Sequence, residues 1–175
     1  MVRKYFGRER VCASLIDKNP ALKTLNIGAG EILWIENDIL FKHPNLISSD
    51  INPKNLGGGN LAKTKKAINA EKIPFKDGTI SQVIILDVLE HIKNDRKVLS
   101  EINRVLKNEG KLLICVPNDT FLSFLNPVRW TEHERHYTVK QIIQLLKIYG
   151  FKTEKILAGG RFFELLHLYL HLFIK

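Results

Sequence analysis

The sequence predicts an α/β domain built on an open, mostly parallel, doubly wound sheet with helices on both faces. Two observations predict it. Short apolar, β-branched runs alternate with amphipathic stretches of about 10–15 residues, and the length of 175 residues fits one domain. Sheets of this kind bind ligands at the carboxyl ends of their strands, near the point where the strand order reverses. A functional site is therefore expected at the strand ends.

Hydrophobic periodicity predicts the individual elements. Compact apolar runs predict strands at 22–27, 46–50, 80–86, 111–116 and 151–157. Apolar residues at helical spacing predict helices at 8–18, 32–40, 96–108 and 139–149. Asp95 and Thr138 are expected to cap the last two helices, because short polar side chains accept hydrogen bonds from free amides at helix starts. The stretch 51–60 is expected to be a mobile loop, and the basic stretch 63–72 has no regular pattern.

The C-terminal segment 161–175 fits two structures. Leucines at every second position from 166 to 172 suit a strand, whereas the polar residues 161, 164, 167, 171 and 175 share one helical face. The leucine-rich composition favours a helix. The segment is interpreted as a final sheet element, a homodimer contact, or an interfacial helix at a membrane surface, with core or dimer packing as the simpler interpretation.

Charge, cysteine content and the length of apolar runs indicate where the protein is located. There are 27 Lys and Arg against 18 Asp and Glu, a formal net charge of +9. The surplus comes from 1–23, with six basic and two acidic residues, and from 51–76, with six and one. Cys12 and Cys115 form no disulfide or zinc motif, and no secretory signal or apolar run of about 20 residues is present. We expect a cytoplasmic protein, with membrane association left open.

The first two predicted strands end in residues suited to a nucleoside. Gly28-Ala29-Gly30 follows the first strand, where glycine permits a tight turn close to a ligand. Asp50 stands 22 residues after Gly28, near the spacing at which an acid binds a ribose diol. Leu33 replaces the third glycine of a dinucleotide motif, so a cofactor without a pyrophosphate is favoured.

Four segments together resemble class I S-adenosylmethionine-dependent methyltransferases: LNIGAGE at 25–31, the acid at Asp50, 69–92, and LSEINRVLKNEGKLLICVPN at 99–118. The nearest branch is the small-molecule, type 11-like one, which includes ubiquinone and glycan O-methyltransferases. The resemblance implies a Rossmann-like sheet ending in an antiparallel hairpin. It also implies a single catalytic domain over 1–175, in which 1–20 forms an N-terminal helix or lid and 158–175 an apolar C-terminal segment.

The resemblance also implies which residues bind the cofactor. They are Asn26, Gly28, Gly30, Asp50, Ile51, Asn69, Ala70 and Asp87. Asp50 would hold the ribose hydroxyls, Asn69 and Ala70 would lie beside the adenine, and Asp87 would border the methionine amino group. The family usually has an acid at the position of Asn26, commonly Asp at Asn69 and often Gly at Ile32, so affinity for the cofactor is expected to be modest.

Candidate catalytic and substrate residues follow the fourth strand and precede the last helix. His91 is the first candidate general base, because imidazole titrates near neutral pH. The family's H-x-R-x-Y-T stretch matches 133–138. It adds His133 as a second catalytic candidate, and Arg135 and Tyr137 as substrate contacts. Glu90, next to His91, is a further expected substrate contact. In the alternative interpretation these residues cap helices and tie the loop to the sheet. A metal site at His133 and His136 is not favoured.

The expected activity is therefore methyl transfer from S-adenosylmethionine to a small molecule or a glycan or lipid-linked intermediate, at oxygen. One rival is a non-catalytic module that binds the cofactor, which Asn26, Ile32 and Asn69 would permit. The other is a nucleic-acid methyltransferase, which is not favoured because Asp87-Val88-Leu89-Glu90 stands where such enzymes have an Asn-Pro-Pro-Tyr type motif. Expected partners are the acceptor, an anionic membrane surface, or a second copy through 161–175.

Overall fold

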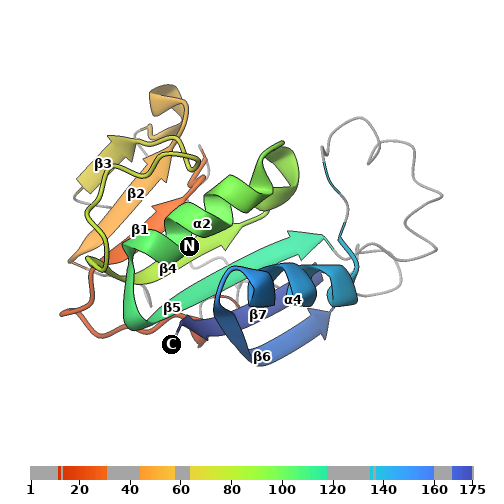
Figure 1. Ribbon diagram of the computed structural model, residues 1–175. Coiled ribbons are helices and arrows are strands. Elements are labelled where there is room, and N and C mark those ends of the chain that lie inside the picture. Colours follow the sequence, from red (N-terminus) through yellow and green to blue (C-terminus); the bar gives the residue numbers. More distant parts are fainter. Residues whose placement is uncertain are drawn as a thin grey trace, which may run out of the picture.

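The computed structural model describes residues 12, 14–30, 44–57, 64–117, 135, 137–159 and 167–174. They form one seven-stranded sheet in the order β3-β2-β1-β4-β5-β7-β6 (Figure 1). The strands are β1 (Thr24–Ile27), β2 (Leu46–Asp50), β3 (Thr64–Ala67), β4 (Ile80–Leu86), β5 (Leu106–Pro117), β6 (Phe151–Gly159) and β7 (His167–Ile174). The helices are η1 (Pro53–Asn55), η2 (Leu89–His91), α2 (Asp95–Val105) and α4 (Val139–Ile148).

The strand directions confirm the predicted fold class. β3, β2, β1, β4 and β5 pair in parallel, and β7 runs antiparallel to both β5 and β6. β1 lies in the middle of the parallel part, with β2 on one side and β4 on the other. The strand order therefore reverses between β1 and β4, which is the position where open α/β sheets bind ligands.

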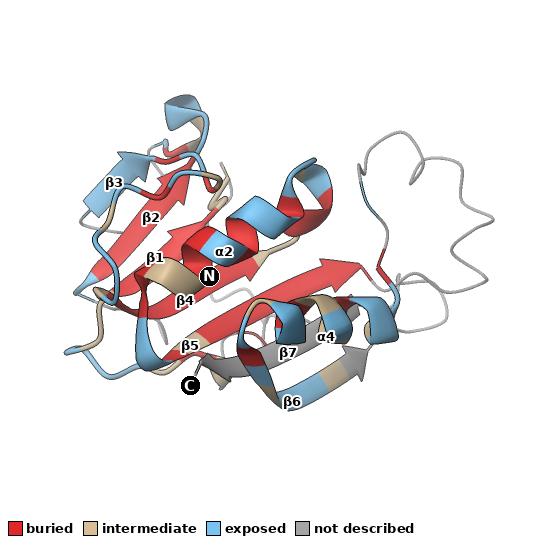
Figure 2. Cartoon of the chain, viewed as in Figure 1, coloured by how far each residue is buried: buried red, intermediate tan, exposed pale blue. Residues whose placement is uncertain are grey.

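Each face of the sheet carries its own apolar core, because side chains alternate along a buried strand. On one face, Val83 and Ile85 of β4 pack with residues of α2 and α4. On the other face, Ile84 packs with Cys12 and Ile16 of the N-terminal segment. Figure 2 shows the central strands buried and β3 exposed. Helical residues therefore cover both faces, as predicted. Part of the helix expected at 8–18 is described, and in it Cys12, Ser14 and Leu15 are helical.

The predicted strands at 46–50 and 80–86 are confirmed residue for residue, and the strand predicted at 22–27 begins at Thr24. Thr138 caps α4 as predicted. Its side chain accepts from the Gln141 amide while the Gln141 side chain accepts from Thr138, which completes a capping box. The helix expected at 32–40 lies outside the described residues.

The boundary between α2 and β5 differs from the prediction. Asn94, not Asp95, is the N-cap residue, and Asp95 is the first helical residue with its carboxylate buried. The helix ends at Val105 rather than at 108, because Leu106 already pairs with Ile80 in the sheet. The sequence suggested Asn108-Glu109-Gly110 as a helix end. In the structure these residues lie within β5, at the register shift before Lys111.

One strand, β3, was not predicted, and β7 lies in the segment for which a final sheet element and a helix were both left open. β3 lies in the basic stretch 63–72, and all four of its residues are exposed at the sheet edge, so it has no apolar pattern to detect. β7 occupies most of the segment whose composition favoured a helix, and that preference is wrong for 167–174. Both edges of β7 are hydrogen-bonded, to β5 and to β6. The antiparallel hairpin implied by the family resemblance is thereby confirmed.

Candidate functional site

The carboxyl ends of β1, β2 and β4 bring the predicted cofactor residues to one edge of the sheet. Gly28 follows β1, Asp50 ends β2, and Asp87 follows β4. In the parallel registers Ile27 lies opposite Ser49 on one side and Ile85 on the other. These three positions therefore lie next to one another at the reversal of strand order.

The glycine turn is bonded to the end of β2. The Ala29 amide donates to the Ser49 carbonyl at 2.9 Å, and the Gly30 amide donates to Asp50 Oδ2 at 3.0 Å. Both glycines have positive φ, +68° at Gly28 and +67° at Gly30, a conformation that side-chain-bearing residues rarely adopt. The turn thus requires glycine at both positions.

The two glycines nevertheless face different surroundings. A Cβ at Gly28 would lie 2.3 Å from Val88 Cγ2, so this glycine lets the turn after β4 pack against the end of β1. Among the described residues, a Cβ at Gly30 would meet no atom within 4 Å. None of these residues therefore fills the space at Gly30 beside the Asp50 carboxylate.

Asp50 is the best-positioned polar group of the site. Its residue is 8% exposed. Oδ2 accepts from Gly30, and Oδ1 accepts from the Asn52 amide at 2.9 Å and from Asn55 Nδ2 at 3.2 Å. A carboxylate has about four acceptor positions, so Oδ2 can accept one more hydrogen bond. The next side chain, Ile51, is 71% exposed and apolar. A carboxylate beside an exposed apolar surface fits a ribose joined to an aromatic base.

The segment after β3 returns to the same edge. The Ile68 amide donates to the Asp50 carbonyl at 2.9 Å. Asn69 Oδ1 accepts from the Glu71 amide at 2.8 Å, so this side chain stabilises its own turn. Ala70 is buried next to it. The turn that carries Asn69 and Ala70 therefore begins at the carboxyl end of β2, where Asp50 lies.

The end of β4 has an unusual backbone. Asp87 adopts φ +52°, a left-handed conformation that Asp tolerates better than most residues. Its amide donates to the Cys115 carbonyl at 3.0 Å, and the Cys115 thiol donates to Asp87 Oδ1 at 3.4 Å. A hydrogen bond with Cys12, together with burial, raises the pKa of the Cys115 thiol. The cysteine is thus a neutral donor that orients Asp87.

Arg135 and Tyr137 contact the beginning of α2. The Tyr137 hydroxyl donates to Asp95 Oδ2 at 2.9 Å, and Arg135 Nε lies 3.5 Å from the same oxygen. The Arg135 amide donates to the Glu90 carbonyl at 3.0 Å. Burial and the hydrogen bond to Asp95 raise the pKa of Tyr137. These contacts favour the structural role of the alternative interpretation, but they tie the segment to η2 and α2 rather than to a strand of the sheet.

Of the remaining predicted residues, some are described in the structure and others lie outside the described residues. Asn26 is 4% exposed within β1, and its carbonyl accepts from Ser49 Oγ at 2.8 Å. His91 is exposed in η2, directly after the buried Glu90. His133 lies outside the described residues, as does His136. The described residues contain no group of three metal-ligating side chains, and none of their helices is long and apolar enough to cross a bilayer.

Sequence reasoning missed the polar residues that surround Asp50. Asn52 caps η1 through Lys54, and Asn55 donates to Asp50. The Asn52-Pro53 pair was an available signal, since Asn before a proline-initiated turn is a frequent cap.

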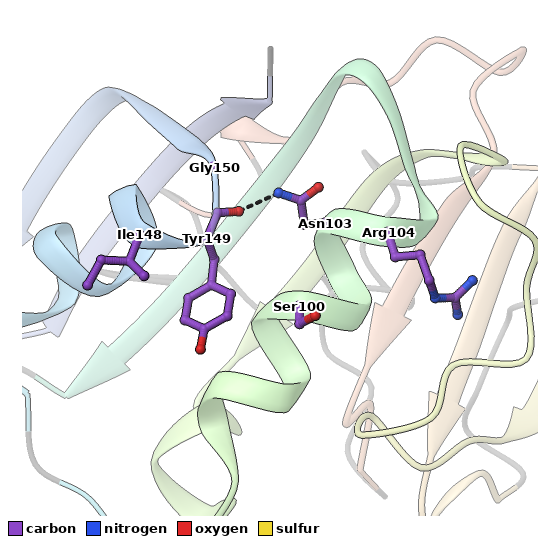
Figure 3. Close-up of a pocket in the computed structure, with 6 residues that line it drawn as sticks. All are labelled: Ser100, Asn103, Arg104, Ile148, Tyr149 and Gly150. Carbon is purple, nitrogen blue, oxygen red and sulfur yellow. Dashed lines mark hydrogen bonds between the residues drawn. The ribbon is translucent and has the colours of Figure 1, made fainter.

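A surface groove of about 420 Å³ lies elsewhere, at the C-terminal ends of α2 and α4 (Figure 3). It is lined by Ser100, Asn103, Arg104, Ile148, Tyr149 and Gly150. The Asn103 side chain crosses it to donate to the Tyr149 carbonyl. Because α2 follows a parallel strand and runs back along the sheet, this groove lies at the edge opposite the cofactor residues. It is separate from the candidate site.

Comparison with known proteins identifies the family. Residues 25–114, about half of the chain, match the family model described as a methyltransferase domain. The chain belongs to the methyltransferase domain family. This confirms the resemblance to class I S-adenosylmethionine-dependent methyltransferases, whose shared cofactor is S-adenosylmethionine. The matched range contains every predicted cofactor residue.

Two of the individual relatives match only part of this methyltransferase domain, at 43% and 28% identity. An uncharacterized protein of Methanocaldococcus jannaschii is 43% identical over 79 residues, 45% of this chain and 35% of the relative. The ubiquinone/menaquinone biosynthesis C-methyltransferase of Brucella canis is 28% identical over 122 residues, 63% of this chain and 45% of the relative. The methyltransferase domain spans between 35% and 44% of the length of the first relatives it matches.

The fold is shared with a solved S-adenosylmethionine-dependent methyltransferase of Methanosarcina mazei. The two superpose with a TM-score of 0.70 at 16% identity, over 94% of this chain and 96% of the other. At that identity the likeness supports the fold alone.

Proposed function

We propose that this chain transfers a methyl group from S-adenosylmethionine to an oxygen atom of a small molecule or of a glycan or lipid-linked intermediate. The observation that carries the proposal is the Asp50 carboxylate, which lies beside the space at Gly30 where the strand order reverses. The cofactor supplies a methyl group on a positively charged sulfur. The protein must orient the two reactants and exclude water.

Each cofactor residue has a physical role in this proposal. Asp50 Oδ2 accepts from a ribose hydroxyl with its remaining lone pair, and Ile51 packs against the adenine ring. Asp87, oriented by the Cys115 thiol, accepts from the methionine amino group. Asn26 offers a neutral amide where the family usually has an acid, so it contributes less affinity than a carboxylate would.

His91 is proposed as the general base, since an acceptor hydroxyl must lose a proton when it is methylated. Its exposed position in η2, directly after Glu90, supports contact with an acceptor at the rim of the site. His133 is retained as a second candidate. Arg135, with 41% of its side chain exposed, is proposed to contact an anionic group of the acceptor. For the buried Tyr137 we propose a role in holding this segment against Asp95.

A carbon acceptor is the second candidate, favoured by the C-methyltransferase names of several relatives. Incubation with methyl-deuterated S-adenosylmethionine and a pool of phenols, quinols and polyprenyl-linked glycans, followed by mass spectrometry and NMR of the product, distinguishes oxygen from carbon methylation. Calorimetry with S-adenosylhomocysteine tests the cofactor site, and Asp50→Ala is expected to abolish binding. A chain that binds neither form of the cofactor would overturn the proposal, whereas binding without any product would support the non-catalytic module.

An anionic acceptor or membrane surface is proposed as the partner of the basic residues. Lys54, Lys65 and Lys66 are exposed on η1 and β3, near the proposed adenine side of the site. Sedimentation with vesicles of neutral and anionic lipid, over a salt series, tests this partner because such attraction is screened by salt. Equal sedimentation with both lipids, or none, would contradict it.

A further inference from the structure

Two charged side chains of α2 lie outside the site just described, yet they contact the segment that carries Asn69 and Ala70. Glu101 and Arg104 are one helical turn apart and form a two-point ion pair. Arg104 Nε donates to Glu101 Oε1 and Nη2 donates to Glu101 Oε2, each at 2.8 Å. In Figure 3 the Arg104 side chain points away from Tyr149. Its direction is toward the segment that joins β3 to β4.

Arg104 uses every one of its donors. Besides the two bonds to Glu101, Nη1 donates to the Phe75 carbonyl at 2.8 Å and to Asp77 Oδ1 at 2.6 Å. Nη2 also donates to the Ile73 carbonyl at 2.9 Å. A guanidinium has five N–H groups, and each has an acceptor here. Arg104 is therefore fully engaged in holding the segment 73–77 and has no donor left for a free anion.

Glu101 completes the same attachment from the helix side. Its Oε2 accepts from the Ile73 amide at 2.9 Å. The hydrogen bond from Arg104 lowers the pKa of Glu101 to about 2 even though burial opposes this. Ile73 is only 2% exposed. Both backbone polar groups of a buried residue are thus satisfied by two side chains of one helix.

The turn that carries Asn69 and Ala70 is consequently held at both ends. At its start the Ile68 amide donates to the Asp50 carbonyl at 2.9 Å. At its end Ile73 is held by Glu101 and Arg104. Within the turn, the Lys72 amide donates to the Asn69 carbonyl at 2.9 Å. The attachment to α2 therefore fixes where Asn69 and Ala70 lie relative to Asp50.

We propose that Glu101 and Arg104 are positioning residues for the cofactor: by holding Ile73 to α2 they place Asn69 and Ala70 beside the adenine. The inference rests on the proposed function of the site. Neither side chain touches the cofactor, so both act through the segment. The effect is accordingly specific for the adenosine part of the ligand and leaves the methyl-transfer step itself intact.

Arg104→Met is expected to weaken binding of S-adenosylhomocysteine about tenfold, because the segment loses its three charge-assisted bonds to Arg104. The KM for S-adenosylmethionine rises by a similar factor while kcat changes little. Arg104→Lys is expected to give an intermediate affinity. An ammonium has only three donors at one point, so it cannot reach all the acceptors that the wider guanidinium contacts. Glu101→Gln keeps the size of the side chain and is the alternative test variant if Arg104→Met does not fold.

A second ligand and a matched variant make the test specific. Methylthioadenosine contains the adenosine of the cofactor but lacks its amino acid part, so Arg104→Met should weaken both ligands by the same factor. Asp87→Ala should weaken S-adenosylhomocysteine alone. Asn103→Ala is the matched control on the same helix, because Asn103 bonds to the Tyr149 carbonyl and not to the segment. It is expected to lower Tm without changing the affinity for either ligand.

The outcomes separate the two proposals. If the unaltered chain binds neither ligand, the proposed function fails. If it binds both, and Arg104→Met and Glu101→Gln bind both with unchanged affinity, the positioning role fails while the proposed function stands. An equal loss of affinity in Asn103→Ala would also overturn the positioning role, since general destabilisation of α2 would then explain the effect.

Discussion

Gly28→Ala tests how the glycine turn is packed. The substitution places a Cβ 2.3 Å from Val88 Cγ2 and 2.9 Å from Cγ1, at a residue whose φ is +68°. A left-handed φ costs an alanine about 1–2 kcal/mol, and crowding of a packed region costs about 1–3 kcal/mol. The free energy of unfolding should thus fall by about 2–5 kcal/mol in urea titrations. Tm should fall by roughly 4–20 °C, because each kcal/mol shifts it by about 2–4 °C at this chain length.

Gly30→Ala is the matched control. Its φ is +67°, but its Cβ would meet no atom of the described residues within 4 Å, so the expected loss is the backbone cost of about 1–2 kcal/mol. Its Cβ enters the space beside Asp50, so it should weaken cofactor binding more than it lowers stability. Val88→Ala should partly rescue Gly28→Ala, because the two sites are in contact. Equal losses of stability in the two glycine variants, or no rescue by Val88→Ala, would refute this reasoning.

Three further predictions concern stability and reactivity. Thr138→Ala should lower the free energy of unfolding by about 0.5–2 kcal/mol through loss of the α4 cap, measured by urea titration with the exposed Lys140→Ala as control. The pKa of Glu101 is lowered from 4.5 to about 2 in the folded chain, so its stabilisation is complete above pH 4.5 and is lost as pH falls toward 2. Glu101→Gln should flatten the fall in Tm across that range, and an unchanged slope would contradict the assignment. The buried Cys115, with its raised pKa, should react with iodoacetamide at pH 8 only as fast as the chain unfolds, as followed by mass spectrometry.

The parts of the fold that sequence predicted well are those specified by local pattern. The strands at 46–50 and 80–86 are short, buried and bounded by turn residues, so their limits coincide with the structure. β3 has no such pattern, because Thr64–Ala67 is exposed and joins the sheet through its backbone pairing with β2. Its existence depends on a neighbouring strand that is distant in sequence, which no local pattern reports.

The same distinction applies to the site. Gly28, Gly30 and Asp50 were predicted because a turn after a strand and an acid at a fixed spacing are visible in the sequence, and the structure brings them together. The attachment made by Arg104 was not predicted. Its acceptors at Ile73 and Phe75 are backbone carbonyls, about thirty residues away, and a carbonyl has no signature in the sequence.

The position of β7 constrains the order in which the sheet can assemble. β6 precedes β7 in the chain but hydrogen-bonds only to β7 within the described sheet, while β7 also pairs with β5. Until residues 167–174 have been synthesised, β5 ends the nascent sheet with an open edge and β6 has no strand to join. Pairing between segments so far apart in the chain slows folding. Pairing of β5 and of β6 within the described sheet therefore depends on a strand that is synthesised after both of them.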